Sequence, residues 1–213
     1  MRTNPFYDAW LFLTGQTDDH ANSGVGPVLV VLFLVLLAAS AWIAYRNWQR
    51  DPAQRTRENL AIWFMRLMIG CMWFQGSVWK LPLPVSGGLQ YWTDEITRNA
   101  AFEIHRWIAA NILLPLLPVL NPLVYLTELS LAVSFMLGFF VRPLAVVGML
   151  FVVHLWLGLY LHPNEWPWLY IFLIFVQGFF IINNAGKSLG LDAMVPRPFT
   201  GDGTLARLYR RFA

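Results

Sequence analysis

The chain has few of the residues that build soluble catalytic centres. It contains one cysteine, Cys71, in 213 residues, so this chain alone cannot form an internal disulfide, a Cys-x-x-Cys redox pair or an iron–sulfur site. Its four histidines show no metal-ligand spacing, and only His154 lies deep in an apolar run, so neither a metal nor a bis-histidine haem is expected. If electrons pass through the protein, their carrier is a bound small molecule or belongs to another subunit.

Charge is also scarce. Charged residues make up 13% of the chain and hydrophobic residues 57%, including 11 Trp and 16 Phe, which is typical of an integral membrane protein. The net charge of +3 does not indicate a nucleic-acid partner, because the basic residues gather beside hydrophobic segments instead of forming a phosphate-reading patch. The composition therefore predicts an all-α protein in a lipid bilayer.

Five apolar segments approach the roughly 20 residues that a membrane-spanning helix needs. They are residues 27–45, 60–79, 121–141, 143–161 and 166–184. The first is expected to remain as an anchor, because a long and mostly polar stretch precedes it and no cleavage site follows it. Residues 1–26 are then an external segment and residues 193–213 a basic cytoplasmic tail.

The loops between these segments predict an orientation. Arginines follow the first span, occupy the turn between the third and fourth, and recur in the tail, whereas most acidic residues lie in the other loops. Positive loops face the cytoplasm. We therefore expect a multi-pass protein of the bacterial inner membrane with its amino terminus outside and its carboxyl terminus inside.

A long stretch between the second and third spans is not apolar enough to cross. Its start, residues 81–88, is rich in proline and glycine, so it cannot continue a helix. Apolar residues then recur at near-helical spacing after Thr93, a candidate N-cap. The pattern predicts an external amphipathic helix over residues 93–114, lying on the membrane surface.

Glu128 lies in the third predicted span, where an unpaired carboxylate costs several kcal/mol, about 3 on insertion scales. Burial and a neighbouring cation act in opposite directions on the pKa of such a group, so it can hold or release a proton near neutrality. Lys80, at the outer end of the second span, could bend its stem toward Glu128. This makes Glu128 the leading candidate for a proton-exchanging group.

Other polar residues fall at two depths when counted along the helices. Gln75, Glu128 and His154 come out about 16–20 Å above the inner boundary, and Arg66 and Gln177 about 10 Å above it. Arg66 could reach the inner interface or donate to Gln177 or to a helix-end carbonyl. The glutamines can equally be hydrogen-bonding links between helices, and His154 a neutral packed imidazole.

Two tryptophans, Trp73 and Trp156, count to about 20 Å from the inner boundary, deeper than interfacial anchors lie. Such rings either pack the bundle or flank a flat ligand. The sequence leaves both interpretations open.

Three motifs, in this order, resemble those of the DoxX/DoxD superfamily. Residues 66–76 with Lys80-Leu81 are similar to its first-helix signature. Residues 128–143, from a glutamate through Leu-Gly to Arg142-Pro143, resemble its second motif, and residues 184–192 resemble its closing motif. The resemblance covers residues 60–192 and implies a four-helix bundle. The span at 27–45 would be an added helix.

The resemblance also implies a function, that of a membrane subunit in a quinone-linked redox complex. One branch, DoxD, serves thiosulfate:quinone oxidoreductase together with a partner subunit, and the long outer loop fits that branch best. On this hypothesis Glu128 or His154 exchanges the quinol proton, and Arg66, Glu128 and Arg142 hold the core together or frame the quinone site. The quinone-binding residues would be Arg66, Trp73, Gln75, Lys80, Trp156 and Gln177.

Two other classes of function remain open. The protein could be a non-catalytic membrane anchor or assembly factor for an enzyme complex, with its polar residues serving helix packing. It could also be a small transporter coupled to protons through Glu128.

Overall fold

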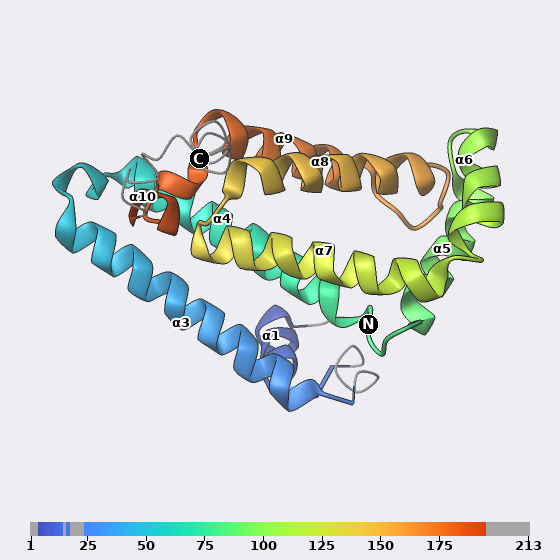
Figure 1. The fold of residues 1–213 in the computed structure, drawn as a ribbon, viewed down its shortest axis with the longest axis horizontal. Coiled ribbons are helices and arrows are strands. Elements are labelled where there is room, and N and C mark those ends of the chain that lie inside the picture. Colours follow the sequence, from blue (N-terminus) through green and yellow to red (C-terminus); the bar gives the residue numbers. More distant parts are fainter. Residues whose placement is uncertain (1–3, 15, 18–23, 195–213) are drawn as a thin grey trace, which may run out of the picture. The chain divides into compact units, whose positions relative to one another are not determined.

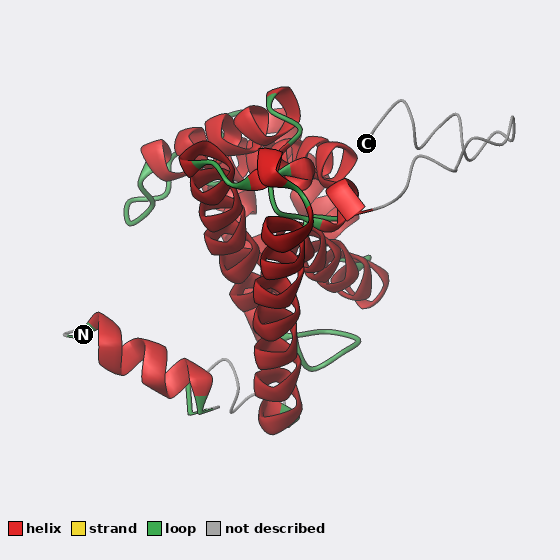
Figure 2. Cartoon of the chain, turned by 90° about the vertical axis from the view of Figure 1, so that its left-hand side faces the viewer, coloured by secondary structure: helices red, strands yellow, loops and turns green. Residues whose placement is uncertain are grey.

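The computed structural model describes residues 4–14, 16–17 and 24–194 of the chain. Most of the predicted basic tail and part of the external segment lie outside these residues. Within them every regular element is a helix and no strand occurs, as Figure 2 shows. In chain order (Figure 1) the elements are α1 (Pro5–Leu13), α3 (Gly26–Arg50), η1 (Pro52–Gln54), α4 (Arg57–Val78), α5 (Gly87–Asn99), α6 (Glu103–Ile108), η2 (Ala109–Leu113), α7 (Leu117–Leu137), α8 (Val141–Gly158), α9 (Pro167–Ile182), η3 (Ala185–Lys187) and α10 (Leu191–Met194).

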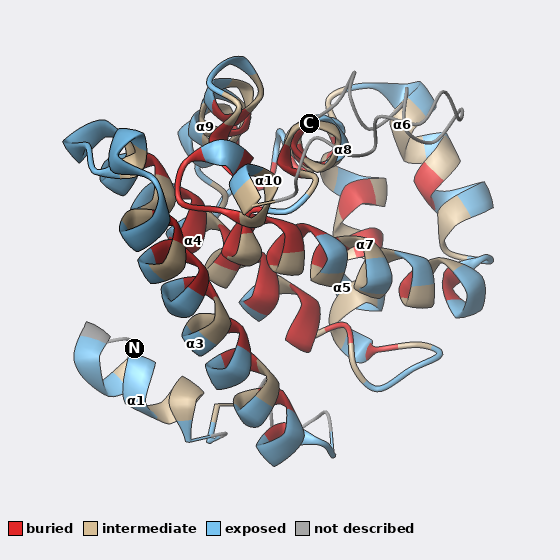
Figure 3. Cartoon of the chain, turned by 60° about the vertical axis from the view of Figure 1, so that its left-hand side comes forward, coloured by how far each residue is buried: buried red, intermediate tan, exposed pale blue. Residues whose placement is uncertain are grey.

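Three of these helices, α3, α7 and α8, are long and apolar enough to cross a membrane. The burial pattern of α3 explains how an almost wholly apolar helix is used. Most of its buried positions recur every three or four residues, at 29, 33, 36, 40, 43 and 47 (Figure 3), while valines, a leucine and the rings of Trp42 and Tyr45 are exposed. An exposed apolar face of this length fits lipid and not water. The structure thus supports an all-helical membrane protein.

The other two predicted spans lack either the length or the hydropathy that a membrane-spanning helix needs. Helix α9 is apolar but only 16 residues long. Helix α4 has 22 residues and contains charged residues, among them Arg66. The five-span topology and its orientation therefore stay predictions.

The chain divides into two compact units, and four of the helices contribute to both. The first unit comprises Met1–Val35, Phe74–Leu129 and Leu157–Glu165, and the second comprises Leu36–Trp73, Ser130–Trp156 and Trp166–Ala213. In the first unit Phe33 of α3 packs against Phe12 of α1 and Phe74 of α4, with ring centroids 5.2 and 5.1 Å away. In the second, Phe135 of α7 packs on Phe180 of α9 at 5.6 Å. Each unit has its own aromatic core.

The single amphipathic helix expected over residues 93–114 is wrong in its bounds. Two helices, α5 and α6, occupy this region, and the π-helical turn η2 extends the second to Leu113. The N-cap is Ser86, whose hydroxyl accepts from Leu89 N at 3.1 Å. Thr93 lies inside α5 and donates to the Leu89 carbonyl of its own helix instead. The serine was overlooked because it sits at the end of the proline-rich turn.

The third predicted span also begins earlier than expected. Helix α7 starts at Leu117, before the predicted first residue Asn121, and includes Pro122. A proline this near the amino-terminal end loses only one helical hydrogen bond. Asn121 is thereby carried inside the helix, where its side chain is fully buried.

Candidate functional site

A buried ion pair joins Lys80 to Glu128 in the first unit. The ammonium Nζ lies 2.9 Å from Oε1 and 2.8 Å from Oε2 of the carboxylate, and the two side chains are 3% and 5% exposed. Glu128 projects from the middle of α7, and Lys80 follows the end of α4 by two residues. The lysine stem turns back along α4, so that Nζ also donates to the Gly76 carbonyl at 3.0 Å. The expected approach of Lys80 to Glu128 is confirmed.

An asparagine and a serine fix the backbone beside this pair. Asn121 of α7 donates through Nδ2 to the Lys80 carbonyl at 2.9 Å, and its Oδ1 accepts from the Ser86 hydroxyl at 3.2 Å. Both side chains are buried. Because buried polar groups need partners, these contacts stabilise the turn that follows α4.

An aromatic ring covers the lysine. The Nζ of Lys80 lies 3.4 Å from the centroid of the Trp79 ring, close enough for a cation–π interaction. On the Glu128 side, Gly76 lies within ordinary contact distance, since a Cβ built there would be 3.7 Å from Oε2. The indole therefore contacts the ammonium and the glycine contacts the carboxylate, while the amide of Asn121 holds the backbone of Lys80.

The chemistry available to this arrangement is proton exchange. A carboxylate and an ammonium can share a proton as an ion pair or as two neutral groups, and neither state leaves an isolated charge in the interior. Such a pair can hold a proton, pass it to a bound polar group, or serve only to join α4 and α7. Which of these occurs depends on whether water or a ligand can reach the pair, and the groups around the pair control this access.

The second unit places Arg66 in a different setting. Its guanidinium donates from Nη1 to the Phe135 carbonyl at 2.6 Å and from Nη2 to the Ser188 carbonyl at 3.3 Å. The residue is fully buried. Of the partners considered from the sequence, helix-end carbonyls are the ones that the structure shows. Arg66 joins the end of α7 to the segment after α9, which supports a role in holding the core together, and its predicted part in quinone binding stays a prediction.

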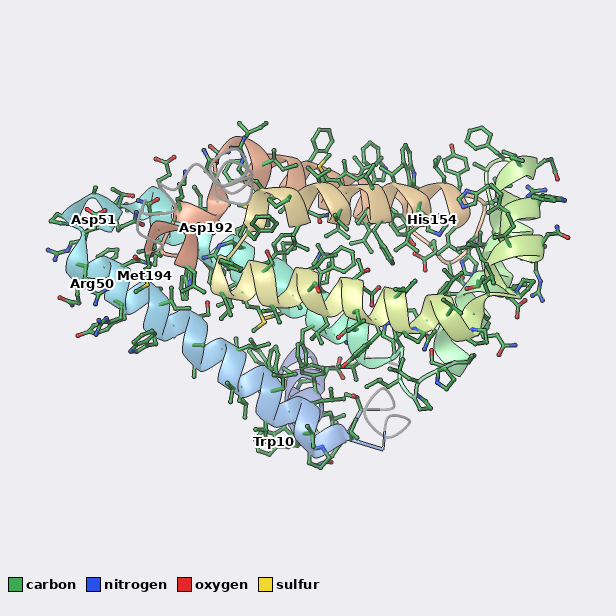
Figure 4. The ribbon with its side chains drawn as sticks, in the orientation of Figure 1. Trp10, Arg50, Asp51, His154, Asp192 and Met194 are labelled. Carbon is green, nitrogen blue, oxygen red and sulfur yellow. The ribbon has the colours of Figure 1, made fainter. Side chains whose placement is uncertain are left out.

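The turn held by Arg66 is closed by an aspartate. Asp192 of α10, labelled in Figure 4, accepts from Phe140 N at 2.9 Å and from Val141 N at 3.4 Å, at the start of α8. Asn47 of α3 donates to the Gly190 carbonyl at 2.9 Å. Anions at helix amino termini are stabilising because the first N–H groups have no helical partner. We call Arg66, Gly138, Ser188, Gly190 and Asp192 the arginine clamp.

Two further predicted residues pack inside the second unit. The Trp73 ring meets that of Phe151 on α8 edge-to-face at 5.7 Å, which favours the packing interpretation of this tryptophan. Gln177 is fully buried and donates to the Leu173 carbonyl of its own helix at 3.1 Å. Its Oε1 lies against Gly148, and only a glycine leaves room for it there. This amide oxygen makes no conventional hydrogen bond within the part of the chain that the structure describes.

The remaining predicted residues lie on α4 and α8. Gln75 is exposed on α4, because the adjacent Phe74 takes the inward position, and its predicted role in quinone binding stays a prediction. His154, labelled in Figure 4, and Trp156 are half-buried on α8 in the second unit. Arg142 is half-buried in the first turn of α8. The structure thus brings together Lys80 and Glu128 and assigns Arg66 to a separate cluster.

Sequence reasoning missed Asn121, Ser86 and Asp192 as site residues. Asn121 was treated as the edge of a span, although an asparagine next to an apolar run was a signal that could have been followed. Asp192 ended the third motif but was given no partner. Hydrogen bonds between residues 35 to 52 positions apart leave no spacing pattern to detect.

Comparisons with family models, characterised proteins and solved structures find no match to this chain.

Proposed function

We propose that this chain is a membrane subunit of a quinone-linked redox complex, of the thiosulfate:quinone oxidoreductase type, in which Glu128 exchanges the proton of the bound quinone. The observation that supports this is the buried Lys80–Glu128 ion pair on a helix apolar enough to span a membrane. An ionisable residue at such a depth is costly and marks a functional site more often than an anchor does.

The residues around the pair fit the polar edge of a quinone. Quinone oxygens accept hydrogen bonds, and their reduction takes up protons together with electrons. Lys80 supplies N–H donors and Glu128 a group that can carry a proton, both in a dry environment where a positioned acid–base group is effective. The chain has one cysteine, so the electrons are expected from a partner subunit.

The topology belongs to the same proposal. We propose that α4 and α9 also cross the bilayer, which gives five spans. The amino terminus would then be external and the carboxyl terminus internal, in the bacterial inner membrane. Because Cys71 is the only cysteine, Cys71→Ser provides a background in which single introduced cysteines can be labelled from either side. Labelling of position 98 from inside the cell, or of position 55 from outside, would contradict this orientation.

The function is tested by comparing Glu128→Gln with Glu103→Gln in protein purified in mild detergent with its partners. We expect Glu128→Gln to abolish thiosulfate-dependent reduction of an added short-chain quinone while folded protein is still obtained. Glu103 is the matched control, because its side chain is 87% exposed in a surface ion pair. Equal turnover of the two variants would remove the proton-exchange role from Glu128.

A second candidate function is a non-catalytic anchor for an enzyme complex. The observation that favours it is the completeness of the network, since Glu128, Gly76 and Asn121 all bind Lys80. A stable partner that co-purifies without extractable quinone would support the anchor. Solute uptake by reconstituted protein that depends on pH and on Glu128 would instead support a proton-coupled transporter.

A further inference from the structure

The position of Lys80 needs support from outside its own helix. Helix α4 ends at Val78, and the next residues enter the proline-rich turn, so helical hydrogen bonding no longer holds the backbone there. The Lys80 carbonyl accepts instead from the Asn121 amide at 2.9 Å. Asn121 is 0% exposed, so water does not compete for this bond.

The same amide connects to the first turn of α5. Its Oδ1 accepts from the Ser86 hydroxyl at 3.2 Å, and the Ser86 oxygen accepts from Leu89 N at 3.1 Å. One serine hydroxyl has the capacity for both roles. A continuous chain of hydrogen bonds therefore runs from the amino terminus of α5 through Asn121 to the backbone of the residue that binds Glu128.

A second contact from α5 reaches the ring that covers the ammonium. A Cβ added at Gly88 would lie 2.7 Å from Trp79 Cε3 and 3.0 Å from the Trp79 carbonyl oxygen, so the α5 backbone rests directly on this indole. The same ring contacts Lys80 Nζ, which lies 3.4 Å from its centroid. The first turn of α5 thus contacts the ion pair in two ways. Ser86 does so through Asn121, and Gly88 does so through Trp79.

We infer that Asn121 is a positioning residue for the Lys80–Glu128 pair and that the first turn of α5 is the cover that keeps the pair dry. Asn121 fixes the position of the Lys80 backbone, from which the side chain starts. The cover limits the access of water to Nζ. The consequence for catalysis rests on the proposed function, whereas the cover can be tested without any activity.

The chain has only two lysines, Lys80 and Lys187, and this makes amine labelling a direct measurement. Lys80 is 2% exposed and Lys187 is exposed. In the full-length protein in detergent, a water-soluble N-hydroxysuccinimide ester should modify Lys187 quickly and Lys80 slowly, as read by peptide mass spectrometry. Asn121→Ala should raise the Lys80 rate about tenfold relative to Lys187, the factor that loss of one buried hydrogen bond gives to a local opening.

The matched control is Asn111→Ala, which removes an asparagine that bonds only the Trp107 carbonyl of its own helical segment and is exposed. It should leave the Lys80 rate unchanged. A Lys80 rate equal in wild type, Asn121→Ala and Asn111→Ala would overturn the inference. So would a wild-type Lys80 that reacts as fast as Lys187.

Serine variants keep the test decisive if Asn121→Ala does not fold. Ser86→Ala removes both hydrogen bonds of the hydroxyl and should expose Lys80, while Ser86→Thr retains the hydroxyl and should restore slow labelling. Equal rates for the alanine and threonine variants would contradict the cover.

The inference and the proposed function fail separately. In the assay of quinone reduction, Asn121→Ala should shift the pH profile of turnover, whereas Asn111→Ala should not. If Glu128→Gln retains turnover but Lys80 labelling still responds to Asn121, the proton role is lost and the cover stands. If turnover depends on Glu128 but the pH profile of turnover is the same in wild type and Asn121→Ala, the positioning role is overturned.

Discussion

The two units each bury a cation, and they satisfy it in different ways. In the first unit Lys80 binds a carboxylate, Glu128, on another helix. In the second unit Arg66 binds backbone carbonyls, those of Phe135 and Ser188. A carboxylate can accept a proton, and a peptide carbonyl cannot do so under ordinary conditions. The difference separates a pair that can exchange a proton from a contact in which the arginine holds the chain in place.

The side chains suit these two tasks. The planar guanidinium presents its donors in a fixed fork and keeps its charge, which favours a permanent structural contact. The lysine ammonium is a compact group on a flexible stem, and it can change its protonation state when buried. From geometry alone we therefore expect the arginine clamp to govern stability and the Lys80–Glu128 pair to govern activity.

The largest effect is expected from Gly138→Ala in the arginine clamp. Gly138 has a φ of 72°, and an added Cβ would collide with the Arg66 guanidinium and lie 2.6 Å from Gly190 Cα. Left-handed strain and overpacking together should cost about 3 kcal/mol or more. Thermal unfolding in detergent should show the loss, or no folded protein should be recovered.

Gly178→Ala is the control, because nothing lies within 4 Å of a Cβ at that position in α9. It should unfold like the wild type. If Gly138→Ala did the same, the clamp would not be a structural centre and the contrast between the units would fail.

The next effect is expected from breaking the ion pair on one side. Glu128→Leu leaves the Lys80 ammonium buried without its carboxylate and should cost about 3 kcal/mol. The double variant Lys80→Met, Glu128→Leu should recover most of that stability, because two apolar side chains can replace a buried pair. Unfolding midpoints of the two variants measure the difference.

The double variant also sharpens the comparison. A protein that is stable and still reduces quinone would make the pair a structural link, like the clamp. For reference, Glu103→Leu, which breaks the exposed pair with Arg106, should cost about 1 kcal/mol or less.

The smallest effect is expected at the cap of α8. Asp192→Ala removes the carboxylate that accepts from Phe140 N and Val141 N and should cost about 1 kcal/mol. Asp51, also labelled in Figure 4, caps only the three-residue η1 at an exposed position. Asp51→Ala should therefore change the unfolding midpoint less than Asp192→Ala does. If Asp51→Ala lowered the unfolding midpoint more than Asp192→Ala, the contact of Asp192 with the start of α8 would add no stability to the arginine clamp.

Sequence reasoning reached the helical membrane class because hydrophobic runs of this length have few other structural uses. It also located Glu128, since a carboxylate in such a run stands out, and it anticipated the Lys80 contact from depth along the helices. It did not predict that Gln75 is exposed, because a depth count gives the height of a residue along a helix and not the direction in which its side chain points. The face of α4 that turns inward is set by Phe74 and its neighbours in the folded chain.

The sequence by itself determined that the chain is helical, apolar and interrupted by a few costly polar residues, because these follow from composition and spacing. Only the tertiary structure decided the partners: Asn121 with the Lys80 backbone, Ser86 with Asn121, and Arg66 with carbonyls 69 and 122 positions away. The physical reason is that a hydrogen bond needs two groups within about 3 Å at a suitable angle. Packing brings distant segments to that range, and no local pattern records it.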